Sequence, residues 1–335
     1  MRVGLLVSFL LLLQLASKAQ HTPTSTPGYL ESDALRAKDR INEQPRYGGL
    51  TKTAAHLRAD EQFLAQALHR YGTPQAAMQA HVAFGWHYLA TNHAPTAIKR
   101  FNQAWLLDST AADVYFGFSA YLRQQGQPGE AERFRQLGQR HDKGNEALLK
   151  YYASQAHSQA LRQDYAGAIA TNEKYLALAP ANAFAHGRTG YWYMQLPDTA
   201  RAAQYLSRAV QLNPQDTVSY LNRGWLRYGQ QQYARAVADF TQAIRVNAHF
   251  VSAYANRALA HTDAGNHAAA IADLQQCLEL VPPRDKGEFH YLLAQVRLKT
   301  NDARGACETL RQALHWGVTP ATEKEIKLLR KSACR

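Results

Sequence analysis

Two stretches of the chain repeat one pattern 34 residues apart. SYLNRGWLRYGQQQYARAVADFTQAI spans residues 219–244, and AYANRALAHTDAGNHAAAIADLQQCL spans residues 253–278. In both, an aromatic ring is followed by Asn-Arg, then by a small residue, and twelve residues after that by alanine. Self-similarity at a fixed period of this length is typical of proteins built from stacked supersecondary units. The pattern therefore predicts a repeat architecture.

The same 34-residue register extends along the chain in both directions. When each repeat is numbered from the residue equivalent to Thr217, position 20 is always alanine, position 8 is always small, and position 4 is always tyrosine or histidine. Small residues at positions 8 and 20 allow two helices to approach closely, and the rings fill the space beside them. The expected repeats start at Met78, Ala112, Leu149, Ala183, Thr217, Val251 and Gly287.

Residues that turn the chain lie near position 15 of the repeats, and proline closes three repeats at position 32. Glycine and asparagine tolerate left-handed backbone, and proline cannot continue a helix. Each repeat is therefore predicted as helix A, turn, helix B, turn. The residues concerned are Asn92, Gly126, Pro197, Gly265 and Asn301 at position 15, and Pro180, Pro214 and Pro282 at position 32.

This pattern resembles the tetratricopeptide repeat family, whose repeat carries aromatic, small, alanine and proline residues at these places. The resemblance spans residues 78–320 and is strongest in the fourth to sixth repeats. It implies an all-α fold: a right-handed α-solenoid of about seven helix-turn-helix repeats with helical caps, in which the A helices line a concave groove.

The second and third repeats depart from the family pattern. Arg135 stands at position 24, where a large apolar residue is usual, with Gly138 at position 27, and Asn172 is at position 24 of the third repeat. Three extra residues, 146–148, interrupt the period between these repeats. Because loops tolerate insertions at small entropic cost, we expect a longer loop there, with a hinge as the alternative.

The N-terminus has the features of a secretory signal peptide. Arg2 precedes an apolar run over residues 3–13, and residues 17–19, SKA, supply small residues for a cleavage site. The run is shorter than the roughly 20 apolar residues that cross a bilayer, so cleavage after Ala19 is favoured over an uncleaved anchor. We therefore expect an exported protein, periplasmic or extracellular, with no integral membrane span after cleavage.

The segments between the signal and the repeats, and after the repeats, suit a linker and two caps. A Pro- and Thr-rich stretch predicts disorder, two helical patterns at residues 31–42 and 52–71 would cover the first repeat, and Ile326, Leu328 and Leu329 lie on an otherwise charged final helix. The expected organisation is a signal at 1–19, a disordered linker at 20–30, an N-terminal helical cap at 31–77, the repeats at 78–320 and a C-terminal capping helix at 321–335.

Three cysteines are too few for a disulfide framework and lack zinc-site spacing. Export would permit one bridge, for which Cys307 and Cys334 are the best pair, although the sequence does not establish the pairing. The favoured interpretation is that the three cysteines are two small buried side chains and one free thiol in the tail.

No catalytic motif is present, and the segments outside the signal and the repeats are too short for a catalytic domain. The fourteen histidines lack the spacing of metal ligands, and His81 stands where other repeats have tyrosine, so packing explains it better. We therefore expect no enzyme activity, no cofactor and no metal. The formal net charge of +12 favours a negatively charged partner, whereas an exported protein rarely meets nucleic acid.

The family resemblance places ligands on the concave face, at positions 2, 5, 9, 12 and 13 of the A helices. Several of these positions carry aromatic rings that helix packing does not require, and aromatic anchors dominate many interfaces. The alternative is that these rings pack on one another or beneath the caps. The candidate aromatic residues are Trp86, Phe116, Phe184, Tyr191, Trp225 and Tyr228.

Two further pairs complete the candidate groove. Asn222 and Asn256 resemble asparagines that some family members use to hold a peptide backbone, because an amide both donates and accepts. Arg223 and Arg257 would orient a ligand through its carboxylates, unless they form a solvated helix face. The predicted function is a non-catalytic protein- or peptide-binding scaffold in the cell envelope. The alternatives are an assembly component that binds through its convex face or caps, and a binder of an anionic polymer or membrane surface.

Overall fold

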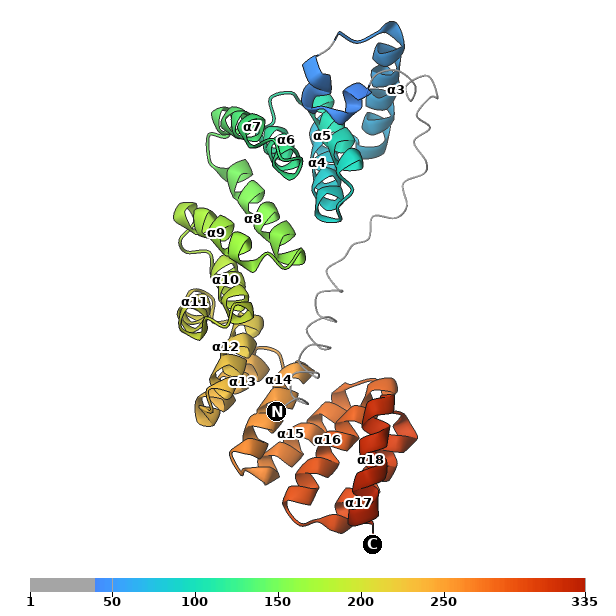
Figure 1. Cartoon of the computed structure of the whole chain (residues 1–335), viewed down its shortest axis with the longest axis vertical. Helices are drawn as coiled ribbons and strands as arrows, with labels where there is room; N and C mark the ends of the chain where they lie inside the picture. Colours follow the sequence, from blue (N-terminus) through green and yellow to red (C-terminus); the bar gives the residue numbers. More distant parts are fainter. Residues whose placement is uncertain (1–39, 50, 335) are drawn as a thin grey trace. The chain divides into compact units, whose positions relative to one another are not determined.

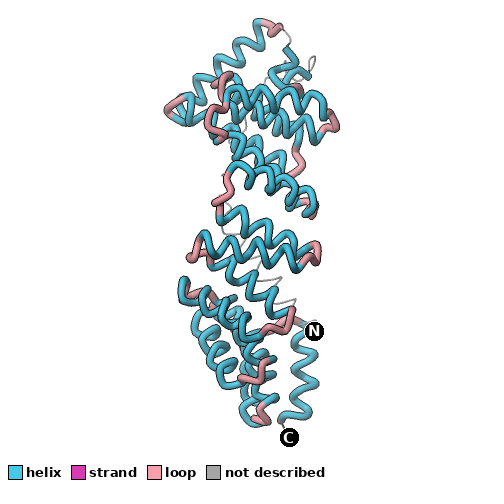
Figure 2. Tube along the Cα trace, turned by 90° about the vertical axis from the view of Figure 1, so that its left-hand side faces the viewer, coloured by secondary structure: helices cyan, strands magenta, loops and turns pink. Residues whose placement is uncertain are grey.

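The computed structural model describes residues 40–49 and 51–334, and within these residues every regular element is helical (Figures 1 and 2). The chain divides between residues 181 and 182 into two compact bodies. The N-terminal body is described over residues 40–49 and 51–181, and the C-terminal body over 182–334. The expected signal peptide, the linker and most of the first expected cap helix lie outside the described residues.

Each body consists of consecutive helix pairs, in which helix A packs against the helix B that follows it. No helix in the described residues is long and apolar enough to cross a membrane. The N-terminal body contains η1 (Arg40–Glu43), η2 (Pro45–Gly49), α3 (Ala54–Tyr71), α4 (Pro74–Ala90), α5 (Ala94–Leu107), α6 (Ala112–Gln124), α7 (Pro128–His141), α8 (Glu146–Leu161) and α9 (Tyr165–Leu178).

The C-terminal body continues the same alternation of A and B helices and ends on one extra helix. Figure 1 shows this last helix, α18, beside α16 and α17, against which it packs. The elements are α10 (Ala183–Gln195), α11 (Thr199–Leu212), α12 (Thr217–Gly229), α13 (Tyr233–Val246), α14 (Val251–Asp263), α15 (His267–Leu280), η3 (Pro283–Asp285), α16 (Lys286–Lys299), α17 (Ala303–Trp316) and α18 (Pro320–Ala333).

The small residues at positions 8 and 20 bring each A helix against its B helix. In the second repeat the Ser119 hydroxyl, at position 8, donates to the carbonyl of Ala131, at position 20, over 2.7 Å. In the fifth, a Cβ added at Gly224 would lie 2.6 Å from the buried ring of Phe240. Position 20 is fully buried in all seven repeats: Ala97, Ala131, Ala168, Ala202, Ala236, Ala270 and Ala306.

The chain turns between helices A and B at position 15, as expected, and in six of the seven repeats the backbone there is left-handed. Glycine adopts this conformation without steric cost, whereas a side chain with a Cβ does so at some cost in energy. In two repeats a glutamine adopts the left-handed conformation, although the sequence predicted no turn residue there. The residues with φ between 59° and 80° at this position are Asn92, Gly126, Gln163, Gln231, Gly265 and Asn301.

The three extra residues between the second and third repeats are helical, so the expectation of a longer loop is wrong. Glu146 begins α8, and residues 146–148 form its first turn. The Asp142 carboxylate accepts a hydrogen bond from the backbone N–H of Leu148 over 2.7 Å and so satisfies one of the free N–H groups at this helix end. Because α8 packs against α4 and α6, the insertion lies inside the N-terminal body and does not divide the two bodies.

The cap segments use both apolar and polar contacts. Helix α3 covers the first repeat, burying Phe63 and Ala67 against α4. The described end of the first expected cap helix is the 3-10 turn η1, and the fully buried Asn102 amide donates to the carbonyl of Asn42 over 3.1 Å. On α18, Ile326 is fully buried, whereas Leu328 is 61% exposed and contributes little to the core.

Cys307 on α17 and Cys334 after α18 form a disulfide, with Cα atoms 5.2 Å apart. The favoured interpretation, in which Cys307 is a small buried side chain and Cys334 a free thiol in the tail, is therefore wrong. Helix α18 folds back along α17 and brings together two residues that are 27 positions apart in sequence. Cys277 is free and buried, and burial raises the pKa of its thiol.

Candidate functional site

In the C-terminal body a cavity of about 390 Å³ is lined mainly by the A helices α14 and α16, with Leu274 of α15 and Leu329 of α18. Most of its wall is aliphatic, and a few amide and charged groups lie among the apolar side chains. This combination is typical of sites that bind a largely apolar group and orient it through few polar contacts. The principal lining residues are Asn256, Leu259, Asp263, Leu292, Gln295, Leu298, Lys299 and Leu329.

One carboxylate, that of Asp263 on α14, connects three successive A helices. It accepts a hydrogen bond from the hydroxyl of Tyr228 on α12, and it lies 3.5 Å from the ammonium of Lys299 on α16. Burial, the Asp263 hydrogen bond and the Asp263 charge all raise the pKa of Tyr228, so that hydroxyl stays protonated and donates. The Asp263 contacts therefore fix the polar edge of the cavity.

An aromatic surface on α12 adjoins this edge. Trp225 stacks on Tyr228 with ring centroids 5.1 Å apart and an angle of 12° between the rings, and the ring of Tyr233 on α13 lies tilted 5.7 Å from that of Tyr228. Both Trp225 and Tyr228 are half-buried and pack against the core of α12 and α13. These two rings therefore pack on the core with one part of their surface and present the rest to solvent.

The two candidate asparagines lie on α12 and α14, one period apart. Asn222 is 7% and Asn256 is 9% exposed. In the described part of the chain, neither side-chain amide takes part in a hydrogen bond. The polar atoms of both amides still reach solvent, so each amide is free to bond to water or to a ligand. Asn256 also lines the cavity, so its amide can meet a molecule that enters.

Arg223 and Arg257 do not have the role expected from the sequence. The Arg257 guanidinium donates two hydrogen bonds to Asp273, and that of Arg223 donates two to Asp239. The arginine side chains are only 19% and 14% exposed. Since internal carboxylates already occupy both guanidinium groups, we correct the expectation that they orient a ligand: they join helices.

Phe116 is a core residue and does not belong to a groove. Its side chain is 1% exposed, and its ring lies 5.2 Å from that of Tyr151. The ring occupies the space left by Gly138, where an added Cβ would lie 2.9 Å from it. The unusual glycine at position 27 of the second repeat is therefore explained by Phe116, which takes the volume that a larger residue would fill.

The remaining aromatic candidates are not gathered in one place. Trp86 lies in the N-terminal body, half-buried, with its ring 5.8 Å from Phe101 and 6.0 Å from Tyr151. Tyr191 is half-buried on α10, and Phe184, on the same helix, is 70% exposed. Among the sequence-predicted residues, Trp225 and Tyr228 lie together. Tyr228 also bonds to Asp263, which lines the same cavity as Asn256.

Most of the residues in the cavity wall are not among the sequence-predicted site residues. Leu259 and Gln295 occupy position 9 of their repeats, and Asp263 and Lys299 occupy position 13, all of which belong to the expected groove positions. These aliphatic, amide and charged residues lack the aromatic side chain that marked most candidates at these positions. Their positions in the 34-residue repeat are the sequence feature that indicates them.

A family model for the tetratricopeptide repeat matches residues 221–285, which contain α13, α14, α15 and most of α12. These are the repeats in which the alanine, small-residue and left-handed turn positions recur with the helix pairs described above. The chain contains tetratricopeptide repeats. In the described residues, this assignment accounts for the alternation of A and B helices in both bodies.

Comparison with solved structures agrees with this fold. The C-terminal part of a tetratricopeptide-repeat-containing protein from Cytophaga hutchinsonii has a TM-score of 0.54 and 13% sequence identity, covering 72% of this chain and 98% of that one. MamA has a TM-score of 0.46 and 20% identity, covering 51% and 96%. YrrB, described as a TPR protein with an unusual peptide-binding site, has a TM-score of 0.42 and 20% identity, covering 54% and 92%. No curated protein matched the chain by sequence.

Proposed function

We propose that this tetratricopeptide-repeat protein is a non-catalytic scaffold that binds a segment of a partner protein on the A helices of the C-terminal body. We call this surface the C-terminal groove, formed by Trp225, Tyr228, Asn222 and the cavity beside Asn256. The observation that carries the proposal is the unpartnered Asn256 amide in the wall of an otherwise apolar cavity.

The chemistry of the C-terminal groove suits an extended peptide. The Asn256 amide can donate to one backbone carbonyl and accept from one backbone N–H, as an unpaired strand requires. An apolar side chain of the peptide would enter the cavity between Leu259 and Leu292, where burial of a leucine-sized group contributes about 2 kcal/mol. Trp225 and Tyr228 would pack against the next side chain. The formal charge of +12 favours an acidic partner.

We also propose that the protein is exported, with its signal peptide removed after Ala19. The apolar run at residues 3–13 supports this, and so does the disulfide between Cys307 and Cys334. Disulfides persist in oxidising compartments such as the periplasm and are rare in the cytosol. Detection of the mature N-terminus at Gln20 by mass spectrometry of the secreted chain would test this part directly.

Affinity capture from an envelope extract tests the binding proposal. The mature chain from Gln20 serves as bait beside two groove variants, Trp225→Ala with Tyr228→Ala, and Leu259→Glu, which places a charge in the cavity wall. Leu178→Glu is the matched control, because Leu178 is an exposed leucine on α9 of the other body. Helical content and the melting temperature of each bait confirm that it is folded.

We expect one protein to be captured by the wild type and the control and lost by both groove variants. Equal capture by all four baits would contradict the proposal and move binding to another face or to the caps. If every bait captures proteins at low salt and none at physiological salt, binding depends on the net positive charge of the surface and not on the C-terminal groove.

A further inference from the structure

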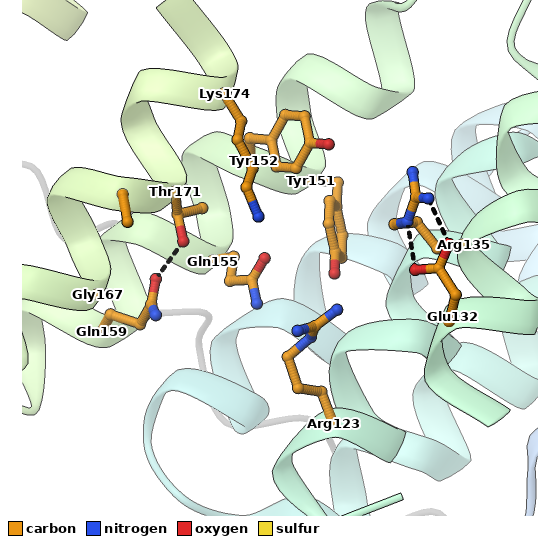
Figure 3. Close-up of a pocket in the computed structure, with 11 residues that line it drawn as sticks. Arg123, Glu132, Arg135, Tyr151, Tyr152, Gln155, Gln159, Gly167, Thr171 and Lys174 are labelled. Atoms are coloured by element: carbon orange, nitrogen blue, oxygen red, sulfur yellow. Dashed lines mark hydrogen bonds and ion pairs between the residues drawn. The ribbon is translucent and has the colours of Figure 1, made fainter. Parts of the chain in front are cut away.

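A second cavity, of about 500 Å³, lies in the N-terminal body where α7 meets α8 and α9 (Figure 3). It coincides with the repeat that departs from the family pattern. Arg135 occupies position 24, where an apolar side chain would normally fill the space between helices. Its guanidinium instead turns to Glu132 on its own helix, with Nε donating to Oε2 over 2.8 Å. The space beside α8 is therefore left open and polar.

The lining of this cavity has an excess of positive charge. The hydrogen bond from Arg135 lowers the pKa of Glu132 to about 2, so these two groups form a stable ion pair with no net charge. Arg123, at the end of α6, and Lys174, on α9, also line the cavity, and neither forms an ion pair or hydrogen bond within the described residues. Both side chains are exposed, and after the pairing of Arg135 with Glu132 the lining of the cavity keeps two positive charges.

Neutral donors in the same wall also lack partners. Tyr151 is 1% exposed, and its hydroxyl has no hydrogen-bond partner among the described residues. Its ring is fixed between Phe116 at 5.2 Å and Tyr152 at 5.4 Å, so the hydroxyl cannot turn to solvent. Figure 3 shows this hydroxyl directed towards Arg123, with the Gln155 amide beside it. A buried hydroxyl without a partner costs free energy that a bound acceptor would recover.

We propose that this cavity, which we call the α7–α8 pocket, binds a small organic dianion that carries carboxylate or phosphate groups. Arg123 would hold an acidic group through paired hydrogen bonds, Lys174 would neutralise the second negative charge, and Tyr151 and Gln155 would donate to the remaining oxygens. The volume lies within the range of about 300–1,000 Å³ that small-molecule sites occupy. The proposal is independent of peptide binding in the C-terminal groove.

Isothermal titration of the full mature chain tests the α7–α8 pocket. Succinate represents the dicarboxylates, glycerol 3-phosphate represents the phosphate esters, and glycerol is the neutral probe. The site variants are Arg123→Gln with Lys174→Gln, and Tyr151→Phe, which removes only the hydroxyl. Arg58→Gln with Lys143→Gln is the control, because it removes the same charge from two exposed residues of the same body. All titrations use one ionic strength.

We expect one or both anions to bind the wild type and the control with the same affinity, and glycerol not to bind. Each site variant should raise Kd about tenfold or more, since hydrogen bonds to charged groups contribute strongly. The relative affinities of succinate and glycerol 3-phosphate identify the acidic group. The groove variant Trp225→Ala with Tyr228→Ala should bind like the wild type, which separates this site from the proposed function.

Three results would overturn the proposal: no binding of either anion to the wild type, full affinity in either site variant, or an equal loss in the control. The last would mean that net charge alone attracts the anions. Unfolding temperatures measured for every variant without ligand show that each is folded, so a loss of binding in a folded site variant is a loss of the site.

Discussion

The guanidinium of Arg257 on α14 donates two hydrogen bonds to the carboxylate of Asp273 on α15, from Nε to Oδ2 at 2.9 Å and from Nη2 to Oδ1 at 2.6 Å. The same arrangement recurs 34 residues earlier, where Arg223 donates to Asp239 at 3.0 and 2.7 Å. The third nitrogen of Arg257 reaches the Thr241 hydroxyl of the preceding repeat at 3.0 Å. Each arginine therefore joins its own helix pair to the one before it.

Removing the acid of this pair should destabilise the fold strongly. Asp273→Ala leaves the Arg257 guanidinium nearly buried without a counterion, and breaking a buried pair in this way costs about 3–5 kcal/mol. Glu308→Ala, which removes an exposed partner of Arg311, should cost much less, because water and salt screen this surface pair. Urea unfolding of both variants measures the difference. Similar costs would mean that the Arg257 pair contributes no more than a surface pair.

Two glycines on α12 should respond oppositely to alanine. Gly224→Ala places a Cβ 2.6 Å from Phe240, which is fully buried and cannot move away, so we expect a loss of about 1–3 kcal/mol. Gly229→Ala has nothing within 4 Å of the new Cβ and should gain up to about 1 kcal/mol by reducing the freedom of the unfolded chain. Thermal unfolding distinguishes the two, and a stabilised Gly224→Ala variant would show that the close approach of α12 and α13 is not required.

Acid should weaken the N-terminal body through His81. Burial, with Arg100 as a further cause, lowers the pKa of this ring from 6.5 to about 4. The unfolded chain therefore takes up a proton that the folded chain does not, so stability is complete above pH 6.5 and is lost as the pH falls towards 4. The full effect is about 3 kcal/mol. Denaturant unfolding at pH 7 and at pH 4.5 should show a smaller difference for His81→Tyr than for the wild type.

The exposed residue His69 on α3 provides the control for this pH dependence. His69→Tyr should retain the wild-type difference between the two pH values, since its ring is not buried. If His81→Tyr and the wild type lose the same stability in acid, another group is responsible. The ring of His81 lies 5.1 Å from that of Phe63, so tyrosine has an aromatic neighbour in the same place.

Reduction of the disulfide should loosen the C-terminal cap. The bond between Cys307 and Cys334 closes a segment of 27 residues, for which the chain-entropy model gives about 3–4 kcal/mol. We expect faster amide exchange in α18 after reduction, because its end at Cys334 is then held only by packing. Cys307→Ser with Cys334→Ser should behave like the reduced protein and should not respond to reductant. Unchanged exchange in α18 after reduction would contradict this role.

The sequence predicted those features of the fold that depend on one position in every repeat. Alanine at position 20 is needed wherever two helices cross, so all seven alanines are buried as expected. The left-handed turn at position 15 was also predicted where glycine or asparagine marks it. It was not predicted at Gln163 and Gln231, because glutamine disfavours a positive φ. The geometry of the helix pair imposes that φ at both residues.

The candidate site was predicted only in part, because burial depends on neighbours that lie far away in sequence. Phe116 was expected in a groove, but the space beside Gly138 takes its ring into the core. Arg257 was expected to bind a ligand, but its guanidinium pairs with Asp273 on the next helix. The sequence does indicate this pair, because an aspartate follows the arginine by sixteen residues in both the fifth and the sixth repeat.

In an array of repeats each helix pair is held by its neighbours alone, so unravelling starts at an end. The disulfide makes the C-terminal end an exception under mechanical load. If the chain is pulled from its C-terminus, tension passes through the sulfur atoms from Cys334 directly to Cys307 on α17. The helix between them, α18, carries no force and cannot be extended. A partner or membrane that pulls on this tail would therefore act on the last repeat itself, and its cap would remain attached to it.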